Sequence, residues 1–261
     1  MSLSIGIVGL PNAGKSTLFN ALLSRQIANC APYPFCTIEP NIGVVAVPDA
    51  RLDKLAEVVA TTEKPPKIPA IVEFKDIAGL VAGASKGEGL GNKFLAHIRE
   101  CAAIVHVLRA FADENVIRNE PINPKSDFEI IKTELCLADL QTLEKQKEPN
   151  PSVATKEEKK RWETVLKLRK GLEAGREIRE IGLIGEELEI VKPLFLLTAK
   201  PAIVVLNIGE KDIGKTIGEI IPICARIEME LTDLDEEERK VYLKELGLAE
   251  SGLEKLIKKG Y

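Results

Sequence analysis

The sequence lacks the long apolar runs of membrane proteins and the paired cysteines of secreted or zinc-binding ones. No uninterrupted apolar stretch in the 261 residues reaches the length of a membrane-spanning helix, and residues 1–4 do not begin a signal peptide. The five cysteines are scattered, without a C-x-x-C pair, which favours reduced thiols over a disulfide scaffold or a zinc site. We therefore expect a cytoplasmic protein with no membrane partner.

Neither sign of charge dominates the sequence. There are 36 Lys and Arg against 40 Asp and Glu, giving a net charge of −4. Such a total neither supports nor excludes a nucleic-acid partner, because these partners recognise local patches. The length fits one large domain, or a core domain with a smaller one, and the 45% hydrophobic content is ordinary for a globular protein.

What the sequence does contain, close to its start, is the pattern G-x-x-x-x-G-K-S at 9–16. It follows an apolar run at 5–8, which predicts a buried strand, and precedes a helical pattern at 18–23. A loop between a strand and a helix can point its backbone N–H groups at a phosphate, at the positive end of the helix. The alternative is a glycine-rich turn that contains Lys-Ser by chance, and the strand and helix around the pattern argue against it. We expect Lys15 to reach the β- and γ-phosphates and Ser16 to bind Mg²⁺. The residues predicted to hold the phosphates are Asn12, Ala13, Gly14, Lys15, Ser16 and Thr17.

Residues 32–40 contain three prolines and are predicted to form an exposed loop. Thr37 stands in this loop, before the next expected strand at 43–47. In P-loop switch proteins a threonine at this place gives its hydroxyl to Mg²⁺ and its backbone N–H to the γ-phosphate. We predict both roles for Thr37; the alternative is an ordinary polar turn residue.

A D-x-x-G motif ends the expected strand at 70–74. Asp76 is placed to make a second contact to Mg²⁺ through a water, and Gly79 to bring a backbone N–H against the γ-phosphate. Leu80 follows, where Ras-like enzymes carry a glutamine that orients the attacking water. Leucine has no hydrogen-bonding side chain, so we expect slow hydrolysis that uses another group, the backbone, a cation or a partner.

Two further strands are expected at 102–108 and 201–206. His106 in the first is interpreted as a core or strand-end histidine rather than a catalyst. The second leads into Asn207-Ile208-Gly209-Glu210, where guanine-specific relatives have N-K-x-D. This chain has Ile208 in place of the Lys and Glu210 in place of the Asp, which weakens guanine recognition. The Asn207 amide can still form hydrogen bonds with N6 and N7 of adenine. The loop at Ala225-Arg226, after a last strand at 221–225, is expected near the base.

Between these strands the α/β alternation stops. Capping boxes at 126–129 and 155–158 predict two long helices that form an antiparallel hairpin. The second helix is expected to bury Trp162, Val165, Leu166 and Leu172. Residues 156–179 contain nine Lys or Arg and five Asp or Glu, which suits either a solvated helix face or a docking surface for RNA phosphates. We divide the chain into a first part of a nucleotide domain (1–125), a helical insertion (126–198) and the remainder of the nucleotide domain (199–261).

These motifs resemble one family along essentially the whole chain. The phosphate loop at 9–17, YPFCTIEPN at 33–41, DIAGLVAGASKGEGLGNKFL at 76–95 and NIGE at 207–210 are similar to the YchF family, the Obg-related branch of the translation-factor GTPases. The resemblance implies an α/β fold, with a Ras-like P-loop domain whose mostly parallel sheet is flanked by helices, interrupted by an α-helical coiled-coil domain. It also implies ATP in preference to GTP, with residual GTP binding, and association with the large ribosomal subunit.

Two features depart from the family pattern. Members normally continue past Tyr261 into a TGS domain, which this chain lacks, and the stretch at 115–118 has no histidine where the family is thought to use one. The catalytic assignment therefore consists of Lys15, Thr37 and Gly79. We expect a monomeric, Mg²⁺-dependent nucleoside triphosphatase without a DNA partner. The alternatives are a guanine-specific Obg-like assembly GTPase and a nucleotide-sensing binding module without turnover.

Overall fold

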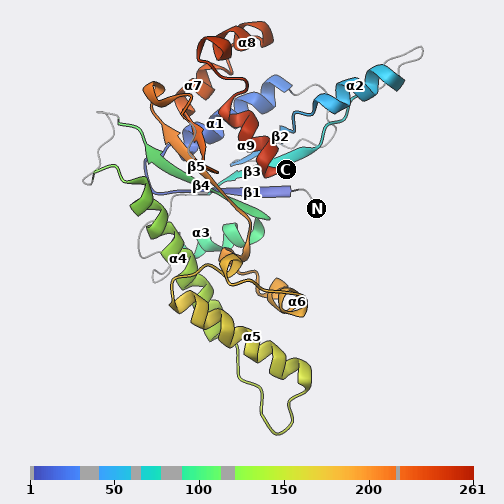
Figure 1. Ribbon diagram of the computed structural model, residues 1–261, viewed down its shortest axis with the longest axis vertical. Coiled ribbons are helices and arrows are strands. Elements are labelled where there is room, and N and C mark those ends of the chain that lie inside the picture. Colours follow the sequence, from blue (N-terminus) through green and yellow to red (C-terminus); the bar gives the residue numbers. More distant parts are fainter. Residues whose placement is uncertain (1–2, 30–40, 60–65, 78–89, 113–120, 216–217) are drawn as a thin grey trace.

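A six-stranded sheet forms the centre of the molecule in the computed structural model, which describes residues 3–29, 41–59, 66–77, 90–112, 121–215 and 218–261 (Figure 1). The strand order is β2-β3-β1-β4-β5-β6; β2 is antiparallel to β3 and every other pair is parallel. The predicted α/β class with a mostly parallel sheet is therefore confirmed. The strands are β1 (Leu3–Val8), β2 (Ile42–Ala46), β3 (Ile71–Asp76), β4 (Ala103–Ala110), β5 (Ala202–Ile208) and β6 (Ile221–Ile223).

Helices cover both faces of the sheet. The adjacent strands β1 and β4 are buried on both faces, β1 over five of its six residues and β4 over seven of its eight. One apolar cluster joins the sheet to α1 and α9, and another joins the opposite face to α3 and α4. The helices before β4 and after β5 are α1 (Lys15–Asn29), α2 (Ala50–Val59), α3 (Leu90–Glu100), α7 (Ala225–Glu230), α8 (Glu236–Glu245) and α9 (Gly252–Gly260), with a 3₁₀ turn η4 at Glu210–Asp212.

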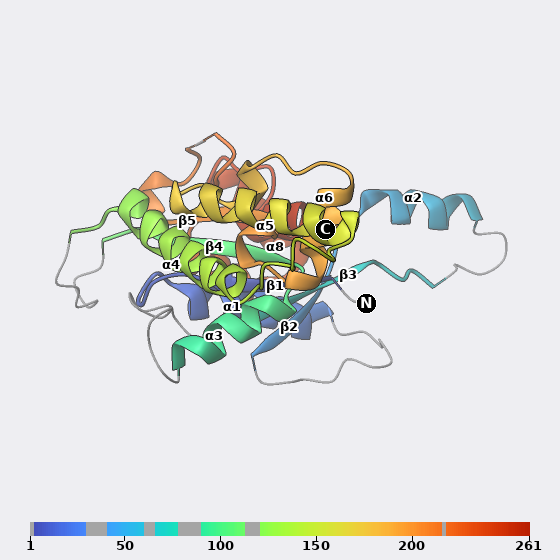
Figure 2. The same ribbon diagram turned by 90° about the horizontal axis from the view of Figure 1, so that it is seen from below.

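Between β4 and β5 the chain leaves the sheet to form a pair of long helices, which extend away from it with a short third helix (Figures 1 and 2). Val165, Leu168 and Leu172 of the second helix pack against Leu143 of the first. Leu166 is 46% exposed, so its predicted burial is wrong; it lies two residues from Leu168, on the outer side of the helix. The elements are α4 (Pro124–Glu144), α5 (Lys156–Glu173), η1 (Ile178–Glu180), α6 (Glu186–Val191), η2 (Lys192–Leu194) and η3 (Leu197–Ala199).

The first helix of this pair begins three residues earlier than its expected capping box. Asn123 is the N-cap of α4, and its side chain accepts from Ser126 N at 3.1 Å. Asparagine is as good an N-cap as serine, and Pro124 fits the first helical position, so the upstream start is preferred. The predicted capping box between Thr155 and Glu158 at the start of α5 is confirmed.

A buried carboxylate joins the two chain segments where the insertion returns to the sheet. Asp139 of α4 accepts from Leu197 N at 2.7 Å, and from the N–H and Oγ1 of Thr198 at 2.8 and 2.7 Å. Burial raises the pKa of the Asp139 carboxyl, and the three hydrogen bonds oppose that rise. The first helix of the insertion is thereby held against η3, shortly before β5 begins.

The three cysteines in the described residues are free thiols. Cys101, Cys136 and Cys224 are all buried, and burial raises the pKa of the Cys136 thiol to about 12. Across the same residues, no group of three His, Cys, Asp or Glu side chains is placed to hold a metal ion. No helix there has the length and apolar character to cross a membrane.

The last helix, α9, is fixed to α1 and α7 by buried charged groups. Arg25 of α1 donates to Ser251 Oγ at 3.3 Å and forms an ion pair with Glu254. On the other side, Glu228 of α7 accepts from Gly252 N at 2.6 Å. The last helix is thereby bonded directly to α1, which follows β1, and to α7, which follows β6.

We expect Arg25→Met to lower the free energy of unfolding by about 2 kcal/mol. The change leaves the partly buried Glu254 without its partner, and hydrogen bonds to charged groups contribute about 1.5–3 kcal/mol each. Urea unfolding followed by circular dichroism measures the loss. Lys240→Met, which removes a lysine from exposed pairs with Glu236 and Glu237, should change stability by less than about 0.5 kcal/mol. Equal losses in the two variants would show that the α9 contacts are no stronger than surface pairs.

Candidate nucleotide-binding site

The predicted strand, phosphate loop and helix are present in that order. β1 ends at Val8 and α1 begins at Lys15. The loop between them curls because Asn12 and Gly14 take left-handed backbone angles, with φ of 63° and 89°. The N–H groups in the first turn of α1 have no partner within the helix, so this end of α1 suits an anion.

Glycine is required at position 14 for space as well as for its backbone angle. A Cβ atom there would collide with Nδ2 of Asn207. The Asn207 side chain comes from the end of β5 and donates to Ala13 O at 3.0 Å. The phosphate loop therefore lies directly on the strand that leads to the expected base-binding residues.

Lys15 lies across the loop that it follows. Its Nζ donates to Leu10 O at 2.9 Å, and the residue is only 8% exposed. Burial lowers the pKa of the Lys15 ammonium, and the nearby Asp76 carboxylate opposes this change. The chain thus places one cation over the loop, within the electrostatic field of the carboxylate predicted to help hold the metal.

Two of the three predicted metal ligands meet. Ser16 Oγ is 3.3 Å from Asp76 Oδ2, because β1 and β3 are adjacent parallel strands with Ile7 opposite Asp76. A hydroxyl and a carboxylate are the oxygen ligands that Mg²⁺ prefers, and Mg²⁺ usually takes only one or two protein groups besides phosphate and water. The donor set therefore fits this metal.

The other predicted phosphate and metal contacts lie outside the described residues. Thr37 belongs to the stretch 30–40, and Gly79 belongs to 78–89 together with Leu80. Their roles remain predictions from the sequence.

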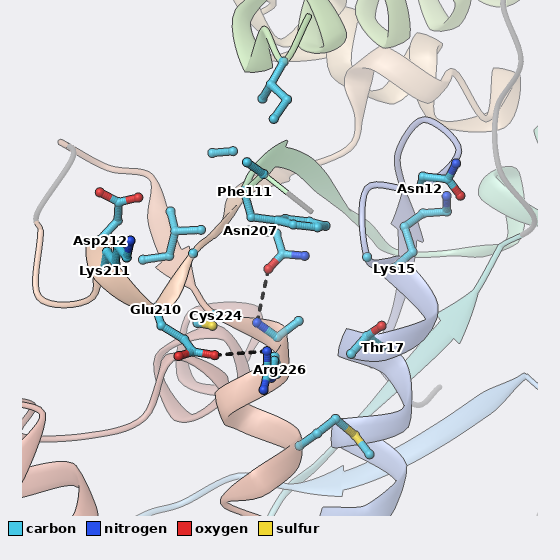
Figure 3. A pocket seen from close by; sticks show the side chains of 18 of the residues that line it. Asn12, Lys15, Thr17, Phe111, Asn207, Glu210, Lys211, Asp212, Cys224 and Arg226 are labelled. Atoms are coloured by element: carbon cyan, nitrogen blue, oxygen red, sulfur yellow. Dashed lines mark hydrogen bonds and ion pairs between the residues drawn. The ribbon is translucent and has the colours of Figure 1, made fainter. Parts of the chain in front are cut away.

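A cavity of about 1140 Å³ runs from the phosphate loop to the ends of β4 and β5 and the start of α7 (Figure 3). Nine of the residues predicted from sequence to hold nucleotide line it, all except Ala13, which is buried in the apolar core. The nine are Asn12, Gly14, Lys15, Ser16, Thr17, Asn207, Ile208, Glu210 and Ala225.

The Asn207 amide joins the two ends of this cavity. Besides its bond to Ala13 O, its Oδ1 accepts from Ala225 N at 3.1 Å (Figure 3). Ala225 is the first residue of α7 and not part of a loop, since β6 ends at Ile223 and Cys224 is the N-cap. These two bonds use one of the two Nδ2 hydrogens and one of the two Oδ1 lone pairs, so one hydrogen and one lone pair of the Asn207 amide remain. The predicted contacts to adenine N7 and N6 would need that remaining pair.

Sequence reasoning missed the aromatic wall of the cavity. Phe111 follows β4 and lines the cavity. The buried guanidinium of Arg109 lies 4.8 Å from the centroid of the Phe111 ring, and its Nε donates to Phe111 O at 3.1 Å. Phe111 could have been predicted from its position, because it directly follows β4 and ligands of open α/β sheets bind at the carboxyl ends of the strands. Other unpredicted lining residues are Lys211, Asp212, Met229 and Glu230. Arg226, which the sequence places near the base together with Ala225, also lines the cavity.

His106 has no part in this site. It is fully buried in β4, and its ring meets Phe128 of α4 edge to face at 5.3 Å. Burial lowers its pKa to about 3, so the imidazole is neutral at physiological pH. The interpretation of His106 as a core residue is confirmed.

Comparison with known proteins agrees with this geometry. A protein-family model described as "50S ribosome-binding GTPase" matches residues 4–156. The chain is 45% identical to the ribosome-binding ATPase YchF of Bacillus subtilis over 281 aligned positions, which cover 100% of this chain and 76% of that protein. It is 46% identical to the protein of the same name from Haemophilus influenzae, with the same coverage. The solved structure of the Schizosaccharomyces pombe YchF GTPase matches with a TM-score of 0.84 and 37% identity, covering 100% of this chain and 75% of that one. The chain belongs to the YchF family of P-loop nucleoside triphosphatases.

Proposed function

We propose that this protein is a Mg²⁺-dependent ATPase of slow intrinsic turnover that associates with the ribosome. The observation that carries the proposal is the single cavity with two chemically different ends. One end has the phosphate loop with Lys15, and the other has Asn207 beside Ile208 and Glu210. A triphosphate and a base can occupy these ends together.

At the phosphate end, the chain's contribution is position and charge. Lys15 supplies a fixed cation, and the N–H groups at the start of α1 supply further positive potential. Ser16 and Asp76 are the described groups that would hold Mg²⁺, which when bound offsets the charge that develops on the phosphates. Phosphoryl transfer needs little covalent help, so such groups are sufficient for a basal rate.

At the base end, the identity of the side chains favours adenine. Glu210 is one methylene longer than the aspartate of guanine-specific proteins, and Ile208 replaces the lysine of the same motif. A site that lacks a well-placed acceptor for guanine N1–H and N2–H loses its discrimination for guanine. The free hydrogen-bonding positions of the Asn207 amide match adenine N7 and N6.

In single-turnover phosphate release, we expect the unmodified protein with Mg²⁺ to hydrolyse ATP faster than GTP at limiting nucleotide. Lys15→Met should slow release by about 100-fold, since it removes a fixed charge from the transferring group. Lys54→Met, on the exposed side of α2, serves as the control and should match the parent. A clear preference for GTP in the parent would overturn the adenine assignment, and an absence of turnover with tight binding would favour a nucleotide-sensing module.

The proposed ribosome association rests on the names of the relatives and on the charge of α5. Lys160 and Lys167 form ion pairs with Glu186 and Glu187, so α6 neutralises one flank of the helix. Among the described residues, Lys156, Lys159, Arg169, Lys170 and Arg176 have no acidic partner, and all of them except the half-buried Arg169 are exposed. The basic surface is therefore smaller than the sequence total implies, but it remains available to RNA phosphates.

We expect the triple variant Lys156→Gln, Lys159→Gln, Lys170→Gln to bind isolated large ribosomal subunits more weakly than the parent. The slope of log K against log salt concentration should become less steep by about 2 to 3, because binding with three fewer phosphate contacts releases fewer counterions. Co-sedimentation at several salt concentrations measures this slope. A matched triple variant on α8 and α9, at the exposed Lys240, Lys244 and Lys255, should leave it unchanged. An unaltered slope in the α5 variant would exclude this helix from the RNA contact.

A further inference from the structure

Three charged side chains stand together at the base end of the cavity. Arg226 Nη1 lies 3.4 Å from Glu210 Oε1, and Arg226 Nε lies 3.3 Å from Glu230 Oε1. All three residues line the cavity. The guanidinium is 76% exposed, so this group is a surface feature of the pocket mouth and not part of the packed core.

Arg226 is held in a defined place relative to the base site. It is the second residue of α7, directly after Ala225, whose N–H is bonded to Asn207. Glu210 is at the start of η4, two residues after β5. The view in Figure 3 shows the Glu210 side chain turned toward Arg226 on α7. One of the two Glu210 carboxylate oxygens is therefore engaged by Arg226. The residue before this arginine, Ala225, is bonded to the same amide that supports the phosphate loop.

The chemistry of the two bases makes this contact relevant to selection. Guanine presents two donors, N1–H and N2–H, which a free carboxylate can accept together. Adenine presents the acceptor N1 beside its N6 amino group, so a free carboxylate repels part of its edge. An arginine that occupies the carboxylate and offsets its charge reduces both effects. It competes with guanine for Glu210 and relieves the repulsion toward adenine.

We propose that Arg226 is a specificity-determining residue, which disfavours guanine by holding the Glu210 carboxylate at α7. The inference rests on the proposed function in that nucleotides must occupy this cavity. It adds a residue outside the N-x-x-E motif to the base-selecting groups. Because exposed ion pairs are weak, the effect is about three- to fivefold in relative affinity.

The test is equilibrium binding of non-hydrolysable ATP and GTP analogues, with Mg²⁺, to the parent, to Arg226→Met, to Glu210→Gln and to the double variant. We expect Arg226→Met to shift the ratio of the two dissociation constants about three- to fivefold toward GTP, mainly through tighter GTP binding. In the Glu210→Gln background, Arg226→Met should produce no shift in this ratio, since position 210 then has no carboxylate for the arginine to hold. Arg226→Lys, which keeps the charge, should lie between the parent and Arg226→Met.

Glu230→Gln is the matched control, because it removes the other ionic partner of Arg226 and leaves the contact with Glu210 in place. It should produce no shift toward GTP. The inference is overturned if Arg226→Met weakens both analogues equally, or if the shift persists in the Glu210→Gln background. Failure of the proposed function would be visible separately, in a parent that binds neither analogue or prefers GTP.

Discussion

The nucleotide site depends on one buried side-chain amide. Asn207, 5% exposed, donates to the phosphate loop at Ala13 and accepts from the start of α7 at Ala225. Each unmade bond would leave a buried backbone group without a partner, which costs about 1–3 kcal/mol. The phosphate end and the base end of the cavity are therefore fixed relative to each other by one residue of β5, and Gly14 is constrained by the space that this residue needs.

The charged groups around this amide gather at two ends of the cavity. Lys15, Ser16 and Asp76 gather at the phosphate end because β1 and β3 are adjacent and both stop at the same edge of the sheet. Glu210 and Arg226 gather at the base end because η4 and α7 follow β5 and β6 at that edge. The same framework continues to the end of the chain, since α1 and α7 both hold α9. The two helices that border the cavity are therefore the ones that hold α9.

The features that could be predicted from sequence are those encoded locally. The phosphate loop follows from a run of apolar residues, two glycines and a helical pattern, all within 20 positions. Asp76 was placed correctly because a strand end is visible as the end of an apolar alternation. The start of α4 was wrong by three residues because Asn123 and Ser126 are both good caps, and only their competition decides.

The features that escaped prediction depend on contacts between distant segments. Nothing near Lys160 indicates that Glu186 will neutralise it, so the basic helix looked more available than it is. Phe111 becomes a cavity wall only through the order of the strands. The double engagement of Asn207 also required the loop and α7 to be in place, whereas the sequence suggested only its contact with a base. Features set by neighbouring residues could be predicted from the sequence, whereas contacts between residues from distant segments could not.

The most direct measurement compares how Asn207→Ala affects two ligands, Mg²⁺-ATP and Mg²⁺-tripolyphosphate, which has no base. If Asn207 supports the phosphate loop, the variant should bind both ligands more weakly, by about tenfold each, with its fold intact by circular dichroism. Weaker binding of ATP alone, with tripolyphosphate binding unchanged, would contradict the account. It would show that Asn207 acts only on the base and that the phosphate loop keeps its shape without it.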